Sequence, residues 1–172
     1  RALADEFGYA VAPTPTLELG GDRVSSTRIR AALAEADFEL AAQLLGRPFE
    51  LAGRVLHGQK LGRQLDAPTA NIALHRIRSP LQGVYAVRVC GGGLEEAPGV
   101  ANVGVKPTIG ESLEATLEVH VLEGSPDLYG ERLTVRFRHK LRDEQKFPSL
   151  DALKAGIAAD KANARTWLAN HG

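Results

Sequence analysis

A hydroxyl and a carboxamide stand two residues apart in Pro68-Thr69-Ala70-Asn71, directly before an apolar run. Proline has no N–H group and suits the entry to a strand. If the chain is extended from Thr69, the side chains of Thr69 and Asn71 point to one face, because alternate strand residues share a face. Two neighbouring neutral oxygens suit a Mg²⁺ ion that also holds phosphate oxygens and water. The tetrapeptide also fits a turn whose Asn and Thr side chains bond their own backbone.

A glycine-spaced basic stretch, GRVLHGQKLGR at residues 53–63, precedes this tetrapeptide. Its glycines would let the backbone approach a ligand closely, and Lys60 and Arg63 would neutralise phosphate. The chain contains no G-x-x-x-x-G-K-[ST] phosphate-binding loop. The stretch also fits a glycine-rich hairpin with solvated basic side chains.

A third candidate is Glu118, in the strand-like segment ATLEVHV at residues 115–121. Leu117 and Val119 would share the buried face, and Glu118 and His120 the opposite face. A carboxylate between apolar neighbours would be partly desolvated, which suits a general base. The alternative is an amphipathic strand with Glu118 and His120 in solvent.

Alternating apolar residues between Gly- or Pro-marked turns indicate the elements that must position these groups. Strand-like segments occupy residues 50–58, 83–90, 99–105, 115–122 and 132–141, which predicts a small antiparallel barrel or a sandwich. Before them, residues 25–46 predict two short helices, with N-caps at Ser25-Ser26-Thr27 and at Asp37, and with Gly46 as the stop. Residues 1–24 predict a strand or helix remnant followed by a loop.

A C-terminal helix is predicted after Pro148-Ser149, which supplies an N-cap. The apolar residues Leu150, Leu153, Ile157, Ala164 and Leu168 form a stripe at helical spacing.

The composition narrows the classes of function. Lys+Arg and Asp+Glu both number 21, so the chain lacks the basic excess typical of nucleic-acid binding. No apolar run approaches the ~20 residues of a membrane span, so we expect neither a nucleic-acid nor a membrane partner. The single cysteine, Cys90, predicts a buried strand thiol in a reducing, cytoplasmic location. The chain has no methionine and begins at Arg1, so we expect a processed chain or a fragment.

The order of these segments, together with GVYAV, GVANVGVKPTIG, LEVHVLEGSPDLYGERL and LRDEQKFPSLDALK, resembles the riboflavin kinase module of bacterial bifunctional riboflavin kinase/FAD synthetase. The resemblance covers about residues 47–168. It implies a mainly β fold with flanking helices, namely a six-stranded antiparallel Greek-key-type β-barrel with a C-terminal helix. It also implies transfer of the ATP γ-phosphate, with Mg²⁺, to the ribityl 5′-hydroxyl of riboflavin, which gives FMN and ADP.

The segment VSSTRIR at residues 24–30 resembles the [IV]SSTRIR motif of the FAD synthetase (FMN adenylyltransferase) module in the same proteins, where it helps to bind ATP phosphates. Residues 1–46 would then be the C-terminal remnant of that module, and residues 47–172 the riboflavin kinase domain. The rest of the adenylyltransferase module has no counterpart in the chain, so we expect no FAD synthesis from it. The motif residues concerned are Ser26, Thr27, Arg28 and Arg30.

The resemblance also assigns roles in the kinase module. Glu118 would be the catalytic carboxylate, and Thr69 and Asn71 would bind the metal. ATP would be bound by Gly53, His57, Gly58, Lys60, Gly62, Pro68, Thr69 and Asn71. Riboflavin would be bound by Asn102, Val103 and Gly104, which lie in a flap over the flavin, and by Arg142.

Two other classes of protein remain as alternatives, and one of them is suggested by a departure from the family pattern. The family commonly has L-G-aromatic before PTAN, whereas this chain has Leu65-Asp66-Ala67. The substitution is compatible with a non-catalytic flavin- or nucleotide-binding β-barrel. A barrel that binds single-stranded nucleic acid would need a basic groove with exposed aromatic residues, yet aromatic residues make up only 5% of the chain. We expect the isolated domain to be a monomer.

Overall fold

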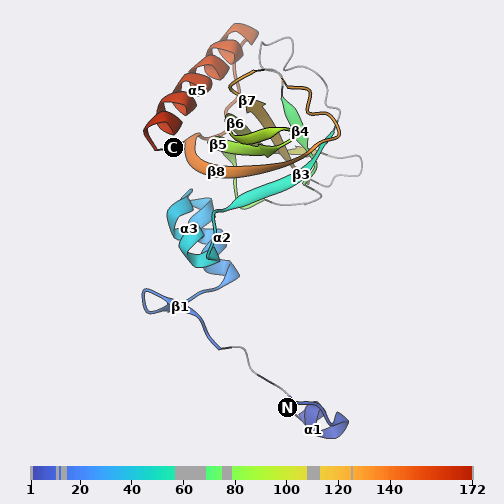
Figure 1. Ribbon diagram of the computed structural model, residues 1–172. Helices are drawn as coiled ribbons and strands as arrows, with labels where there is room; N and C mark the ends of the chain where they lie inside the picture. The colour runs from blue at the N-terminus through green and yellow to red at the C-terminus, as the bar shows by residue number, and fades with distance from the viewer. Residues whose placement is uncertain are drawn as a thin grey trace.

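A computed structural model describes residues 2–10, 12, 15–56, 69–74, 79–107, 113–124 and 126–171. Six antiparallel strands close into a barrel (Figure 1), as predicted. The strands are β3 (Glu50–Leu56), β4 (Ala70–Ile72), β5 (Gly83–Gly91), β6 (Leu94–Pro107), β7 (Leu113–Val121) and β8 (Arg132–Arg142).

The strand order around the barrel is β3-β4-β7-β6-β5-β8. Strands β5, β6 and β7 follow one another in space as in sequence, and β8 returns to pair with β5. Three consecutive strands and a fourth beside the first make a Greek key, so the predicted topology is confirmed. Pairing of β3 with β8 closes the barrel.

Alternation of side chains along the strands builds the core. In β7, Leu117, Val119 and Val121 are buried, as predicted, and Val87 and Val135 join them from β5 and β8. The intervening residues point to the outer face of the barrel. Cys90 lies on that outer face and is half-buried rather than buried, with its Sγ–H donating to Glu96 Oε1 at 3.2 Å.

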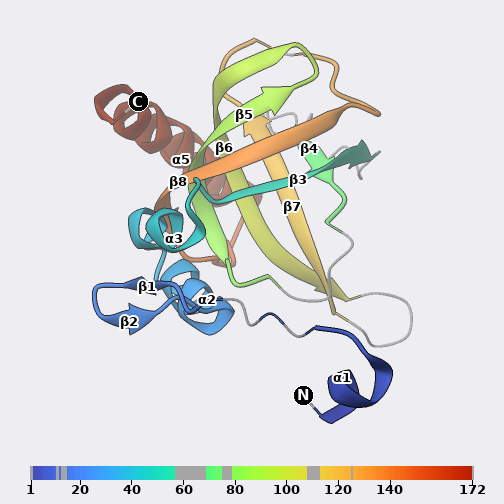
Figure 2. The same ribbon diagram turned by 60° about the horizontal axis from the view of Figure 1, so that its bottom comes forward.

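Two short helices, α2 (Ser26–Ala34) and α3 (Phe38–Leu45), pack against one end of the barrel (Figures 1 and 2). The predicted caps are confirmed: Ser25 accepts from the Arg28 N–H, Asp37 accepts from the Leu40 N–H, and Gly46 ends α3 with a φ of 71°. The ring of Phe38 contacts Tyr85 and Phe137 of the barrel, with centroid separations of 5.9 and 6.0 Å. The helical pair and the barrel therefore share one hydrophobic core.

The C-terminal helix α5 (Leu150–Asn170) lies along the outside of the barrel (Figure 1). Its Ala164 and Leu168 pack on Ala86 and Leu122. Leu150, predicted to join this stripe, is instead 59% exposed, because it begins the helix beyond the barrel contact. Two barrel arginines stabilise the other end of the helix, since Arg88 donates to the Leu168 carbonyl and Arg138 to the His171 carbonyl.

Before α2 the chain forms a short helix, α1 (Ala2–Phe7), and a two-stranded hairpin of β1 (Glu18–Leu19) and β2 (Asp22–Arg23). Gly20 and Gly21 make its turn with positive φ angles of 64° and 84°, as the Gly-Gly-Asp signal indicated.

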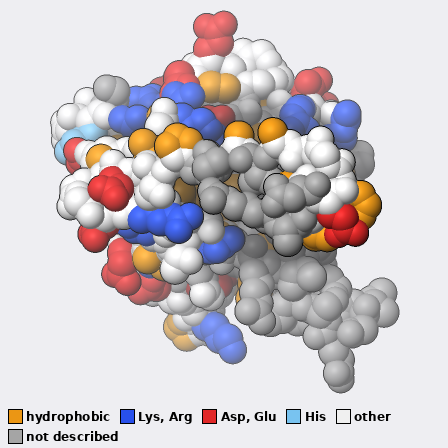
Figure 3. All heavy atoms as spheres, turned by 90° about the horizontal axis from the view of Figure 1, so that it is seen from below, with side chains coloured by type: hydrophobic (Ala, Val, Ile, Leu, Met, Phe, Trp, Pro, Cys, Tyr) orange, Lys and Arg blue, Asp and Glu red, His pale blue; other side chains and the backbone are white. Residues whose placement is uncertain are grey.

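Charges of both signs are mixed on the surface. Figure 3 shows Lys and Arg side chains next to Asp and Glu side chains on the face seen from below. No helix in the described part of the chain is long and apolar enough to cross a membrane.

The Phe38 contacts give a test of the shared core. We expect Phe38→Ala to lower the free energy of unfolding by about 2–4 kcal/mol, because the half-buried ring would leave a void between Tyr85 and Phe137. Urea denaturation measures the change. Phe7→Ala is the matched control, since Phe7 is 69% exposed and should alter the free energy by less than about 0.5 kcal/mol. Equal stability of both variants and the wild type would show that the Phe38 ring does not stabilise a core shared by the helical pair and the barrel.

Candidate active site

A row of three polar side chains crosses adjacent strands on the outer face of the barrel. Asn71 of β4 lies directly opposite Glu118 of β7, and Glu118 lies directly opposite Asn102 of β6. Opposed residues in antiparallel strands project to the same side, with Cβ atoms about 4.5–5.5 Å apart. Their sequence neighbours are buried in the core, which fixes all three side chains on the outside: Ala70, Ile72, Leu117, Val119, Ala101 and Val103. We call Asn71, Glu118 and Asn102 the polar row.

Thr69 extends the polar row along the chain. It lies directly before β4, is half-buried, and stands two residues from Asn71. Extended backbone through β4 places the two side chains on the same face, as the spacing indicated. A hydroxyl, two carboxamides and one carboxylate therefore lie on a single face, each half-buried.

Asn102 is distinctive within the polar row because its Oδ1 atom is buried without a hydrogen-bond partner among the described residues. Buried carboxamide oxygens in folded proteins are nearly always paired. Asn102 stands directly opposite Glu118 in the ladder, and its Oδ1 atom is suited to accept a hydrogen bond from a hydroxyl group.

The expected flap is not one: Asn102, Val103 and Gly104 lie within strand β6, which is hydrogen-bonded to β5 on one side and to β7 on the other. Val103 and Gly104 differ from Asn102. The Val103 side chain is buried in the barrel core, so only its main chain faces the site. Gly104 lies against the Glu144 carboxylate, since a Cβ there would be 2.5 Å from Glu144 Oε1. The chain after β8 thus brings a carboxylate onto β6 two residues beyond Asn102.

Arg142 lies at the end of β8 and is directly opposite Val84, which is itself opposite Asn102. Its guanidinium binds Asp160 of α5 with two hydrogen bonds, from Nε to Oδ1 at 2.9 Å and from Nη2 to Oδ2 at 2.7 Å. Sequence analysis did not single out Asp160. The signal was present, because this charged residue stands within the apolar stripe of the helix, three residues after Ile157 and four before Ala164.

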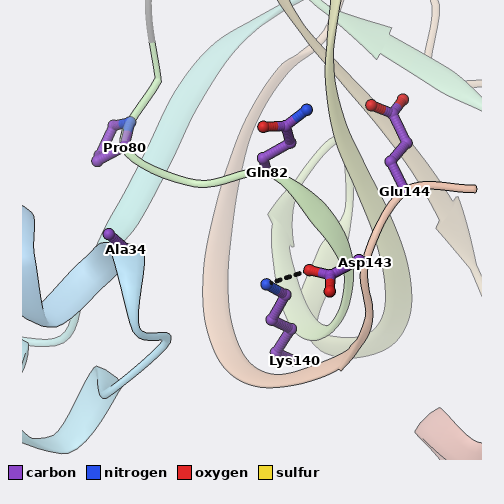
Figure 4. A pocket seen from close by; sticks show the side chains of 6 residues that line it. All are labelled: Ala34, Pro80, Gln82, Lys140, Asp143 and Glu144. Atoms are coloured by element: carbon purple, nitrogen blue, oxygen red, sulfur yellow. Dashed lines mark ion pairs between the residues drawn. The ribbon is translucent and has the colours of Figure 1, made fainter.

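A cavity of about 410 Å³ opens between the helical pair and the barrel beside this segment (Figure 4). Lys140 and Asp143 form an ion pair of 2.6 Å in its wall, and this hydrogen bond raises the pKa of Lys140. Tyr85 fixes the position of Gln82, another residue of the wall, because its hydroxyl donates a hydrogen bond to the Gln82 carbonyl at 2.8 Å. Burial raises the pKa of that phenol. The lining residues are Ala34, Pro80, Gln82, Lys140, Asp143 and Glu144.

Gly53, which we expect to let the backbone approach ATP, also has a packing requirement. A Cβ at this buried position would collide with the Ala73 carbonyl oxygen and lie 2.7 Å from Ile72 Cγ2. The bare backbone therefore allows β3 and β4 to approach. Apart from Thr69 and Asn71, the other expected ATP-binding residues lie outside the described residues: His57, Gly58, Lys60, Gly62 and Pro68. Arg63 and the Asp66-Ala67 pair do so too.

The SSTRIR segment forms the start of α2 and lies apart from the polar row. Arg28 donates from Nη1 to the carbonyls of Leu19 and Asp22, at 2.9 and 3.1 Å, and so ties the β1–β2 hairpin to the helix. Ser26, Thr27 and Arg30 are exposed.

Comparisons with known proteins identify the class of this barrel. The riboflavin kinase (flavokinase) family matches residues 45–168. The chain belongs to this family, which confirms the resemblance in its motifs, and family membership implies riboflavin and ATP as small-molecule substrates.

The chain is 59% identical over 162 residues to a bifunctional riboflavin kinase/FMN adenylyltransferase from Pseudomonas fluorescens, covering 94% of this chain and 52% of that protein. Among solved structures, it resembles a macrolide-efflux protein from Streptococcus pneumoniae, with a TM-score of 0.76, 34% identity and coverage of 96% and 54%. It also resembles the riboflavin kinase from Trypanosoma brucei, with a TM-score of 0.51, 28% identity and coverage of 70% and 80%. The chain thus spans about half the length of the bifunctional relative.

Substitution of Gly53 tests its packing role. We expect Gly53→Ala to lower the free energy of unfolding by about 1–3 kcal/mol, because the added methyl overpacks the β3–β4 contact. Urea denaturation gives the value, and Ala52→Ser, on the exposed face of the same strand, serves as control. Unchanged stability combined with weaker ATP binding would instead support a ligand-binding role for Gly53.

Proposed function

We propose that this chain transfers the γ-phosphate of ATP to the ribityl 5′-hydroxyl of riboflavin, giving FMN and ADP. The observation that carries the proposal is the polar row, because strand register brings Asn71 and Asn102 to either side of Glu118. Phosphoryl transfer needs positioning and electrostatic stabilisation more than covalent chemistry. A carboxylate flanked by two carboxamides, on the outer face of a rigid barrel, suits that requirement.

Glu118 is the proposed general base. Its carboxylate would accept the proton of the 5′-hydroxyl as that oxygen attacks the γ-phosphorus. The buried Oδ1 of Asn102, which has no donor among the described residues, supports a role in accepting a hydrogen bond from a ribityl hydroxyl beside the base. The flavin would then lie over β6, next to Gly104 and the segment after Arg142.

Thr69 and Asn71 are the proposed Mg²⁺ ligands. The donor set fits, because a hydroxyl and a carboxamide oxygen on one strand face are hard, neutral oxygen ligands, and Mg²⁺ commonly keeps water and phosphate oxygens in its remaining positions. When bound, the ion would neutralise negative charge on the phosphates. The two side chains would orient the nucleotide relative to Glu118.

The whole protein is proposed to make FAD as well, since the bifunctional relative carries both activities in its name. We assign residues 1–46 to the adenylyltransferase side and residues 47–172 to the kinase domain. This chain alone would produce FMN without FAD, because it spans only about half of such a protein. The single cysteine supports a reducing, cytoplasmic location, and we propose a monomeric kinase domain.

A direct assay tests the function. Purified chain is incubated with riboflavin, ATP and Mg²⁺, and the flavins are separated by chromatography. FMN without FAD is expected. Riboflavin binding without FMN would favour a non-catalytic flavin-binding barrel, and absence of both would refute the proposal.

Replacement of the proposed base should affect turnover selectively. We expect Glu118→Gln to lower kcat by at least about 10²-fold, since general-base assistance contributes roughly 10²–10⁴-fold, with nucleotide affinity largely unchanged. Steady-state kinetics and calorimetry separate the two effects. Glu123→Gln, at an exposed glutamate just beyond β7, is the control. Near-normal turnover of Glu118→Gln would rule out the assignment.

Replacement of the proposed metal ligand should affect nucleotide binding. We expect Thr69→Ala to weaken ATP binding in the presence of Mg²⁺ and to have little effect with EDTA, because only the metal-linked contact is lost. Thr69→Ser retains the hydroxyl and should bind as the wild type does. Unchanged affinity of Thr69→Ala in Mg²⁺ would contradict the ligand role.

A further inference from the structure

The segment that joins β8 to α5 is attached to the helix at both ends. At the start, Arg142 forms the two-hydrogen-bond ion pair with Asp160, and its Nη1 donates to the Asp143 carbonyl at 2.9 Å. All three guanidinium nitrogens are therefore engaged within the protein. Such planar, two-point pairing fixes orientation as well as distance.

At its other end, the segment is anchored by Phe147. A Cβ at Gly156 of α5 would lie 2.5 Å from the Phe147 ring, so the ring rests on bare helix backbone. The Arg142 guanidinium lies 5.5 Å from the centroid of the same ring. Gly156 and Asp160 are four residues apart, which places both anchors on one face of α5.

Between these anchors the chain presents Glu144 to the site. Its carboxylate lies against Gly104 of β6, two residues from Asn102, and it also lines the cavity (Figure 4). The Glu144 side chain is exposed to solvent, so packing against neighbouring residues does not fix its position. Its position depends on the chain on either side.

The attachment of this segment to α5 depends on Asp160. It is only 6% exposed and is the one buried charged residue in the part of the chain that the structure describes. Burying a charged side chain away from water costs free energy unless the charge is paired and hydrogen-bonded. Arg142 satisfies both Asp160 oxygens, so the ion pair and the course of the segment depend on each other.

We propose that Asp160 is a positioning residue that holds residues 143–147 as the flavin-side wall of the active site. The inference rests on the proposed kinase function. Asp160 acts through Arg142, and Arg142 acts by fixing this segment, with its guanidinium committed to Asp160 and the Asp143 carbonyl. Loss of the pair releases Glu144 from Gly104 and widens the site beside Asn102.

The test is Asp160→Asn, which keeps the shape of the side chain and removes its charge. Riboflavin affinity, measured by fluorescence quenching, is expected to fall at least tenfold, and KM for riboflavin to rise to match. Affinity for ADP with Mg²⁺ is expected to stay within twofold, and kcat within threefold. Asp151→Asn is the matched control, because Asp151 is exposed on the same helix. Asp160→Glu retains the carboxylate and should recover part of the lost affinity.

Phe147→Leu provides a second variant, which removes the other anchor while keeping an apolar side chain. It should show the same selective loss of riboflavin affinity. Unchanged riboflavin affinity in Asp160→Asn, equal weakening of riboflavin and nucleotide, or loss of folding in both variants would overturn the inference. A wild-type chain that makes no FMN would overturn the proposed function as well, whereas an active wild type with an unchanged KM for riboflavin in Asp160→Asn would overturn only this inference.

Discussion

The hydrogen-bonded register of β4, β7 and β6 is the constraint on which the rest of the candidate site depends. Asn71, Glu118 and Asn102 lie far apart in sequence and meet only because each stands directly opposite its neighbour in the ladder. A slip of one residue in either pairing would turn a polar side chain into the core and bring an apolar one out. Because both neighbours of every polar-row residue are buried, the hydrophobic core opposes that slip.

The flanking helices also differ in whether they pack on the interior or on the outer face of the barrel. The helical pair α2–α3 contributes to the interior core at one end of the barrel, whereas α5 covers part of the outer face beside the polar row. The row is thus bordered by α5 and by the segment that leads into it. Apolar residues attach α5 to the barrel, and barrel arginines bind the helix at its middle, through Asp160, and at its C-terminal end.

Local features of this structure could be predicted from the sequence, and long-range pairings could not. Ser25, Asp37 and Ser149 cap helices as their residue types indicate, and β7 buries the expected face. Alternation places Thr69 and Asn71 together, but nothing local states that Glu118 faces them, because that depends on register across the barrel. The packing requirement at Gly53 was also not predictable from residue type, because it depends on the approach of β4. Asp160 was missed because its partner is 18 residues away and belongs to another element.

The pairing of β3 with β8 has a consequence for how the chain folds. These strands are separated by about 75 residues, and closure of the barrel requires both. During synthesis, the meander of β5, β6 and β7 is complete before β8 exists, so β5 has an open edge until the last strand arrives. Such non-local pairing slows folding, and unpaired edges favour association with other chains. Until β8 arrives, the unpaired edge of β5 is therefore a place where the incomplete barrel can pair with a strand of another chain.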